Sequence, residues 1–172
     1  RQSVQKAKSL LADSGDQGIL AHGWWTTQMP PPIWWRTYDK SGGQFVEQCT
    51  HLLDICRYTM GDVVEVCAFR AGGFMNEVPD FTVDDAMVVN CRFASGALAS
   101  FSTGCFPLGG HPETPGGGIS LSLSSRTHRV VLSGWSFEGT VYSGEDAQEK
   151  IPCDENIFIN QNKAFLDAVA TG

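Results

Sequence analysis

Residues 41–58 read SGGQFVEQCTHLLDICRY, and the spacing of their apolar side chains predicts an amphipathic helix. With 3.6 residues per turn, one side of this helix carries Phe45, Cys49, Leu52 and Cys56. The opposite side carries Glu47, His51, Asp54 and Tyr58. The polar side therefore holds a cluster of titratable groups, which either faces water or lines a site.

The predicted limits of this helix are residues 42 and 60. Ser41 and Gln44 have the spacing of a capping box, and Gly61 suits a C-terminal stop. The preceding segment, MPPPIWWRTYDK (29–40), contains three prolines, which lack backbone N–H donors, so we expect no regular structure there. Two further helices are expected near the ends of the chain, over residues 2–12 and 156–170.

Most of the remaining chain shows a two-residue apolar period, which is typical of β-strands. We expect strands in residues 18–26, 62–70, 83–93, 97–104, 118–125, 128–134 and 137–144, with a hairpin turn at 95–96. Short polar turns join most of them, which favours antiparallel pairing over repeated βαβ units. The sequence therefore predicts an α+β fold with an open, mostly antiparallel mixed sheet and helices on one face.

Composition excludes several classes of partner. The chain has 172 residues, 42% of them hydrophobic, as in an ordinary globular domain with its own core. With 12 Lys and Arg against 19 Asp and Glu, its net charge is −7, which repels a phosphate backbone and argues against nucleic-acid binding. No apolar run approaches the ~20 residues that span a bilayer, so we expect no membrane partner.

The ends and the cysteines indicate a cytoplasmic domain cut from a longer polypeptide. We expect one domain over 1–172, truncated at both ends, with a residual helix in 1–17 and the sheet domain in 18–172. The N-terminus lacks the hydrophobic segment of a signal peptide. The six cysteines (49, 56, 67, 91, 105 and 153) form no C-x-x-C pair and fall largely in apolar positions. Buried, reduced thiols explain them better than disulfides or a zinc site.

The helix cluster permits three interpretations. A carboxylate near His51 could orient its imidazole, and a histidine with an ordinary pKa near ~6.5 can take a proton from an alcohol. The spacing of Glu47 and His51 would also suit a metal, but no second His or Cys lies at ligand spacing, so we expect no metal site. The third interpretation is a solvated helix face.

The residues before the helix could wall a pocket for an anionic ligand. Trp34, Trp35 and Arg36 combine large apolar surfaces with a positive charge, and Lys40 follows. Gly42 and Gly43 allow close backbone approach, either to a ligand or to a neighbouring strand. The two tryptophans could instead pack under the sheet. The Gly/Pro-rich stretch 107–118 lacks the G-K-[ST] ending of a phosphate loop and is interpreted as a surface loop that could cover a substrate.

The run WWRTYDKSGGQFVEQCTHLLDICRYTMGDVVEVCA (34–68) resembles the start of the C-terminal domain of the glucose–fructose oxidoreductase/inositol dehydrogenase/MocA (Gfo/Idh/MocA) superfamily. TVDDAMVVNCRFASGALASFSTG (82–104) and KAFLDAVATG (163–172) are similar to further segments of that family, in the same order. The resemblance implies a dihydrodipicolinate-reductase-like open sheet that pairs subunits into a homodimer or homotetramer. It also implies an NAD or NADP cofactor, bound mainly by an N-terminal Rossmann domain whose motifs these 172 residues lack.

The resemblance implies roles for individual residues. His51 would be the acid/base at the substrate alcohol, with Glu47 as its supporting acid. Asp54 matches a position that is more often structural, while Arg36, Lys40, Trp35, Gly42 and Gly43 would lie near the cofactor or substrate. Two positions depart from the family pattern: the helix acid is commonly Asp rather than Glu47, and the third glycine of a triplet is Gln44 here.

These observations favour the substrate-binding half of an NAD(P)-dependent oxidoreductase acting on the CH–OH group of a sugar, polyol or related compound. We expect this fragment to be inactive without its nucleotide-binding half. One alternative is a non-catalytic, ligand-sensing regulator of the same family. Another is a protein-interaction domain that uses the exposed sheet face.

Overall fold

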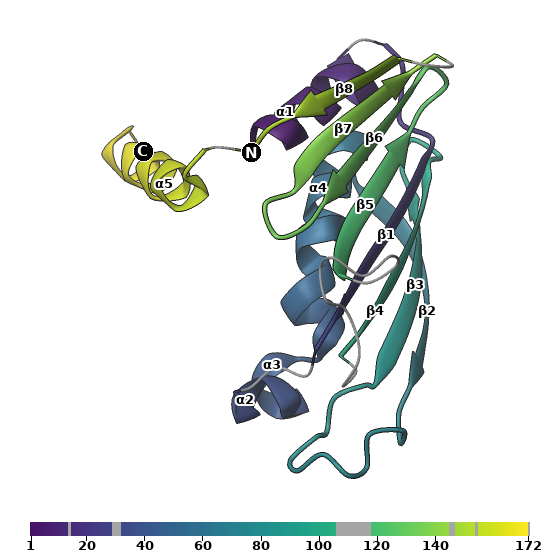
Figure 1. The fold of residues 1–172 in the computed structure, drawn as a ribbon, viewed down its shortest axis with the longest axis vertical. Coiled ribbons are helices and arrows are strands. Elements are labelled where there is room, and N and C mark those ends of the chain that lie inside the picture. The colour runs from purple at the N-terminus through teal and green to yellow at the C-terminus, as the bar shows by residue number, and fades with distance from the viewer. Residues whose placement is uncertain (14, 29–31, 106–117, 145–146, 154, 172) are drawn as a thin grey trace.

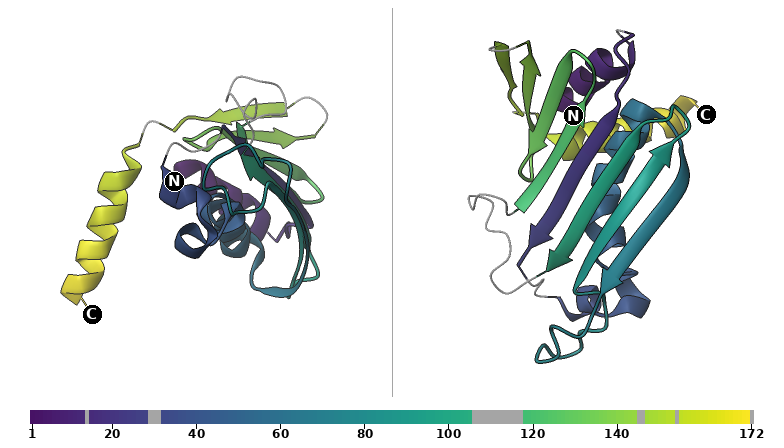
Figure 2. Two further views of the ribbon diagram at one scale, coloured as in Figure 1. Left: turned by 90° about the horizontal axis from the view of Figure 1, so that it is seen from below. Right: turned by 90° about the vertical axis from the view of Figure 1, so that its right-hand side faces the viewer.

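The fold is an open sheet covered on one face by helices (Figures 1 and 2). The computed structural model describes residues 1–13, 15–28, 32–105, 118–144, 147–153 and 155–171. Within these ranges the chain forms one eight-stranded sheet with the order β2-β3-β4-β1-β5-β6-β7-β8. The strands are β1 (Leu20–Thr27), β2 (Val63–Ala71), β3 (Ala86–Phe93), β4 (Leu98–Cys105), β5 (Gly118–Ser124), β6 (His128–Ser133), β7 (Glu138–Ser143) and β8 (Ala147–Ile151).

Pairing within the sheet is antiparallel except between β1 and β4, which run parallel at its centre. The predicted fold class, a mostly antiparallel mixed sheet with helices on one face, is therefore confirmed. The described helices are α1 (Gln2–Lys8), η1 (Ser9–Asp13), α2 (Ile33–Arg36), α3 (Tyr38–Ser41), η2 (Phe45–Cys49), α4 (Thr50–Met60) and α5 (Ile157–Thr171). Of these seven elements, η1 and η2 are π-helical turns.

The core lies between the sheet and the layer formed by α1, η1, η2 and α4. Leu52 of α4 meets Phe101 of β4 and Leu121 of β5 across Gly23 of β1. A Cβ atom at Gly23 would lie 3.1–3.2 Å from carbons of all three side chains. Glycine therefore lets α4 approach the middle of the sheet closely, and this approach fixes the height of the helix above β1.

The long helix follows the predicted faces but not the predicted start. Cys49, Leu52 and Cys56 are fully buried, while His51 and Asp54 are exposed, as the apolar period requires. The helix begins at Phe45 with one π-helical turn rather than at residue 42, and Gly61 closes it at φ 95°.

The expected capping box is wrong. Ser41 ends α3, and its Oγ accepts a hydrogen bond from the backbone N–H of Gly43 at 3.1 Å. Gln44 is buried, and its Oε1 accepts a hydrogen bond from the Cys105 thiol at 3.1 Å. The side chain of Gln44 is thus directed to the sheet rather than back to the helix N-terminus.

Two other expectations need correction. Residues 33–41 form the short helices α2 and α3, because the prolines precede Ile33 and leave the N–H groups of 33–41 available. Cys67 is exposed rather than buried, since it lies on the edge strand β2, whereas Cys49, Cys56, Cys91 and Cys105 are buried. All six cysteines are free. The Gly/Pro-rich stretch 107–118, interpreted as a surface loop, lies outside the described residues except for Gly118, which begins β5.

None of the described helices covers the second face of the sheet (Figure 2). No helix in the described ranges is long and apolar enough to cross a membrane. The C-terminal helix α5 stands apart from the sheet and has no buried residue along its length (Figure 1). Asn156 caps the N-terminus of α5: its Oδ1 accepts a hydrogen bond from the backbone N–H of Ile159 at 3.2 Å.

Asp16 ties the segment before β1 to the turn between β5 and β6. Its carboxylate accepts hydrogen bonds from the hydroxyls of Ser125 and Thr127, and from the backbone N–H groups of Thr127 at 3.1 Å and Arg126 at 3.2 Å. These bonds, led by that of Ser125, hold the pKa of the Asp16 carboxyl well below its usual range.

Replacing Asp16 with Asn should lower the melting temperature at pH 7. A depressed folded-state pKa contributes stability above the unfolded pKa of about 3.9, and this contribution is lost as the pH falls through the folded-state value. The melting temperatures of the two proteins should therefore converge as the pH is lowered below about 4. Asp39→Asn, at an exposed carboxylate of α3, is the control. A constant difference from pH 7 to pH 2 would contradict this account.

Candidate functional site

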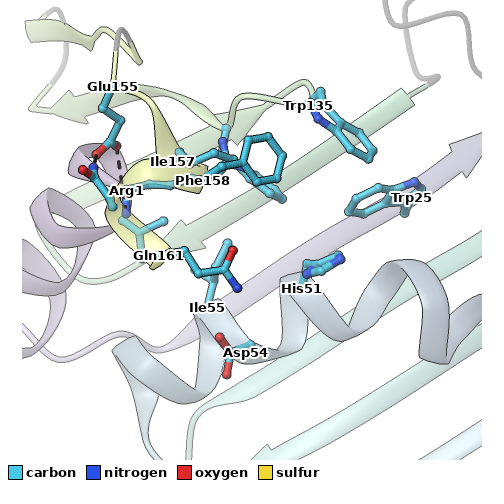
Figure 3. Close-up of a pocket in the computed structure, with 13 residues that line it drawn as sticks. Arg1, Trp25, His51, Asp54, Ile55, Trp135, Glu155, Ile157, Phe158 and Gln161 are labelled. Atoms are coloured by element: carbon cyan, nitrogen blue, oxygen red, sulfur yellow. Dashed lines mark hydrogen bonds and ion pairs between the residues drawn. The ribbon is translucent and has the colours of Figure 1, made fainter. Parts of the chain in front are cut away.

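A pocket of about 560 Å³ opens between the start of α4, strand β1, the β6–β7 turn and the start of α5 (Figure 3). Its aromatic wall comes from Trp25, Trp135, Phe137 and Phe158. The polar groups on its other side include His51, Asp54 and Gln161. Helix α5 forms one wall, so the pocket combines residues from both ends of the chain.

His51 lies in the first turn of α4, on the side of the helix that faces away from the core. Its imidazole packs against the indole of Trp25, with ring centroids 5.6 Å apart and an angle of 34° between the planes. Within the described part of the chain, the imidazole makes no hydrogen bond or ion pair. Both ring nitrogens are therefore available to a ligand in the pocket.

Trp25 reaches this pocket because of its position in β1. Side chains alternate between the faces of a strand, so Trp25 lies on the helix-covered face and Trp24 on the open face. The indole of Trp25 also meets Trp135 edge-to-face, with centroids 5.8 Å apart, and Phe137, with centroids 6.4 Å apart. Three rings thus form a continuous apolar surface beside His51, of the kind that packs against C–H groups.

Asp54 follows His51 by about one turn and lines the same pocket. Gln161 of α5 points into the pocket from the opposite side (Figure 3). A carboxylate, an amide and an imidazole can together bind the hydroxyl groups of a small polar molecule, and the imidazole can exchange a proton with one of them.

Glu47 does not meet His51 as the sequence led us to expect. It lies within the π-helical turn η2, whereas His51 lies in the α-helical turn that follows. A π-helix needs more residues per turn than an α-helix, so side chains four apart no longer lie above one another. Among the described residues, no hydrogen bond or ion pair joins Glu47 to His51, and Glu47 is absent from the pocket lining.

The remaining predicted site residues gather at the other end of η2. Trp35 stacks on Trp34 with centroids 5.7 Å apart, and the backbone carbonyl of Arg36 accepts a hydrogen bond from the N–H of Thr82. Lys40 is exposed in α3. Gly42 and Gly43 have φ values of 76° and 95°, a left-handed conformation that ends α3. None of these five predicted residues lines the pocket of His51 and Asp54.

The cysteines near the site are not suited to catalysis. Burial raises the pKa of the Cys49 thiol to about 12 and raises that of Cys56 further. Both thiols therefore stay protonated at neutral pH and are poor nucleophiles. In the ranges that the structure describes, no three His, Cys, Asp or Glu side chains gather as they would around a metal ion.

Trp25 and Trp135 line the pocket but were not among the predicted site residues. The pair of tryptophans at 24–25 sits in a predicted strand, so one of them had to lie on the helix-covered face. The alternation therefore placed one tryptophan beside the helix layer, but the sequence of the strand does not determine which face the helices cover. Trp135 lies in the β6–β7 turn, where no period constrains its direction.

Comparisons with known proteins agree with this architecture. A family model described as "GFO/IDH/MocA C-terminal domain" matches residues 4–130. A search of curated proteins gives no match. Three solved structures share the fold: an oxidoreductase domain protein from Kribbella flavida, an NAD binding oxidoreductase from Klebsiella pneumoniae, and a levoglucosan dehydrogenase in complex with NADH and levoglucosan.

The Kribbella protein is 22% identical over 89% of this chain, with a TM-score of 0.70. The corresponding values are 17%, 88% and 0.69 for the Klebsiella protein, and 18%, 87% and 0.67 for the levoglucosan dehydrogenase. This chain covers 43–44% of each of those chains, which is less than half of their length. The family match extends over most of the sequence, and the chain therefore belongs to the GFO/IDH/MocA family, as a C-terminal domain.

Proposed function

We propose that these 172 residues form the substrate-binding half of an NAD(P)-dependent oxidoreductase that acts on the CH–OH group of a sugar, polyol or related compound. The observation that carries the proposal is His51, whose two unbonded ring nitrogens face a pocket with an aromatic wall. A histidine so placed can accept the hydroxyl proton while the carbon-bound hydrogen leaves as hydride.

The nicotinamide of NAD or NADP would supply the hydride acceptor. The described residues contain no glycine-rich turn between a strand and a helix that could hold the dinucleotide phosphates. We therefore assign that role to a separate nucleotide-binding domain, in keeping with relatives more than twice as long as this chain. This chain would bind the substrate, exclude water from it and exchange the hydroxyl proton at His51.

The pocket suits a sugar-like substrate. Indole faces pack well against the C–H groups of a sugar ring, and the exposed indole of Trp135 presents such a surface beside the buried Trp25. Asp54 and Gln161 can receive hydroxyl groups on the other side. One structural neighbour, the levoglucosan dehydrogenase, was solved both with levoglucosan and with L-sorbose, which supports the same class of ligand. Trp35, Arg36, Lys40, Gly42, Gly43 and Glu47 remain predicted contacts of cofactor or substrate.

The test is turnover by the full-length protein that contains this chain. With levoglucosan, L-sorbose and myo-inositol as probe substrates, we expect reduction of NAD⁺ or NADP⁺, followed by absorbance at the wavelength of the reduced nicotinamide. The 172-residue chain by itself should bind NADH no more tightly than roughly millimolar. Micromolar binding by calorimetry would show that the nucleotide site had been misplaced.

A ligand-sensing regulator is the second candidate. No hydrogen bond or ion pair joins a carboxylate to His51 among the described residues, which favours a regulator, because a catalytic histidine usually has a carboxylate that orients it. Binding of a probe sugar by the full-length protein without nicotinamide reduction would identify the regulator. If the full-length protein bound neither a sugar nor a dinucleotide, the result would favour the protein-interaction domain instead.

We further propose that the open face of the sheet joins subunits into a dimer or tetramer. Residues paired across neighbouring strands point to the same side, and on this side Phe69, Val88, Leu98 and Leu20 are exposed. The serines of β5 lie on the same side of the sheet, next to β1, and their side chains are small. The ion pair of Arg92 and Glu65 lies on the same side. Exposed apolar side chains gathered on a sheet face are typical of an interface.

Sedimentation should show a dimer or tetramer at micromolar concentration, with at least ~1,200 Å² buried in total per contact. Val88→Asp would place a charge in the middle of this surface and should shift the protein towards monomer. Val46→Asp, at an exposed position of η2 outside the sheet, is the matched control. A monomer across all concentrations would contradict the proposed interface.

A further inference from the structure

His51 is held by aromatic packing rather than by a carboxylate. Its one described partner is the indole of Trp25, at 5.6 Å between centroids. Among the described residues, neither the expected carboxylate of Glu47 nor that of Asp54, which lines the pocket, makes a hydrogen bond or ion pair with it. The orientation of the imidazole therefore depends on the ring beneath it.

Trp25 is well suited to this task because it is itself immobile. It is buried in β1, whose backbone pairs with Thr103 of β4 on one side and Ile119 of β5 on the other. Edge-to-face contacts with Trp135 and Phe137 fix the indole ring. A rigid strand in the middle of a sheet positions a functional group more accurately than a loop does.

We propose that Trp25 is a positioning residue that sets the direction of the His51 imidazole, in the place usually taken by a carboxylate. The inference rests on the proposed acid/base role of His51. The indole limits rotation of the imidazole about its side-chain bonds and leaves both nitrogens directed at the pocket. Misdirection of a reacting group by about 1 Å can cost about 10²-fold in rate, so the contact has a measurable consequence.

The first test measures side-chain orientation in the 172-residue chain and needs no activity. Three-bond couplings to the His51 side chain report its χ1 rotamer by NMR. We expect a single rotamer in the wild-type protein, averaged rotamers in Trp25→Leu, and the single rotamer again in Trp25→Phe, which keeps a ring. Trp24→Leu is the matched control, since it removes the adjacent indole from the opposite face of the same strand. A single unchanged rotamer in folded Trp25→Leu would overturn the proposal.

The second test uses the full-length enzyme with the probe sugar that it oxidises. Trp25→Leu should lower kcat by about 10–10²-fold, and Trp25→Phe should recover most of this loss. Trp24→Leu should leave kcat unchanged. Glu47→Gln should lower kcat by less than Trp25→Leu does; the reverse order would overturn the proposal and restore Glu47 as the orienting group.

The two proposals can fail separately. Should His51→Ala retain full turnover, the acid/base role would be wrong, whatever the rotamer measurement shows. Should His51→Ala abolish turnover while Trp25→Leu, with a native melting profile, keeps normal kcat, only the positioning role would be wrong.

Discussion

Replacing His51 with alanine in the full-length enzyme should lower turnover by about 10²–10⁴-fold, the usual cost of losing a general acid/base. The imidazole is the only ring with a basic nitrogen among the described residues of the pocket. Because the side chain lies on the exposed side of α4, the free energy of unfolding should change by no more than about 0.5 kcal/mol. Steady-state kinetics and thermal melting together test this result.

His22→Ala provides a matched control for His51→Ala. His22 is also an exposed histidine beside an indole, with centroids 5.8 Å from Trp24, but it lies on the open face. Its replacement should leave kcat unchanged. A second variant, His51→Gln, keeps a planar polar group against Trp25 and should lose as much turnover as the alanine. Unchanged kinetics in both His51 variants would show that the acid/base assignment is wrong.

The sheet was predictable because each strand except the last shows a two-residue period. In β5 the alternation of Ser with Ile and Leu directs the apolar side chains to the core and the serines to the open face. The sequence did not reveal β8, since the three central residues of AQEKI (147–151) are polar or charged and no apolar–polar alternation results. It pairs with β7 through backbone hydrogen bonds, which residue type barely constrains.

The helix face was predictable, but its irregular start was not. A period of 3.6 residues describes α4, whereas η2 contains a π-helical turn that no side-chain pattern marks. The buried amides of Gln44 and Gln48 explain the departure in part. Gln48 Nε2 donates to Thr27 Oγ1 at 3.0 Å, and its Oε1 accepts from Thr103, so η2 is bound to β1 and β4. Tertiary contacts therefore decide the local geometry.

The site was predictable only for residues on a single element. His51 and Asp54 share a face of one helix, and the structure places both in the pocket. The arrangement of Trp25, Trp135 and Phe158 around them depends on how β1, the β6–β7 turn and α5 meet in space. The displacement of Glu47 follows from the π-helical turn. Spacing along the chain cannot reveal either feature.

The largest expected loss of stability comes from replacing Phe101 with alanine. Phe101 is fully buried in β4 beneath Gly23 and meets Phe45 of η2 edge-to-face, with centroids 6.3 Å apart. Removing a buried phenyl ring costs about 3–5 kcal/mol, because transfer free energy is lost and a cavity remains. Against a total stability of about 5–15 kcal/mol, this loss is a large fraction of what holds the domain folded.

Urea unfolding should show a lower midpoint with an unchanged slope, because the surface exposed on unfolding stays nearly the same. The melting temperature should fall by about 6–20 °C. Phe74→Ala is the matched control, since Phe74 is 76% exposed and its replacement should change the free energy of unfolding by no more than about 0.5 kcal/mol. A loss below about 1 kcal/mol for Phe101→Ala would mean that η2 and α4 do not pack against β4 as described. The removal of a ring packed between Phe45 and Gly23 should lower the free energy of unfolding by more than that.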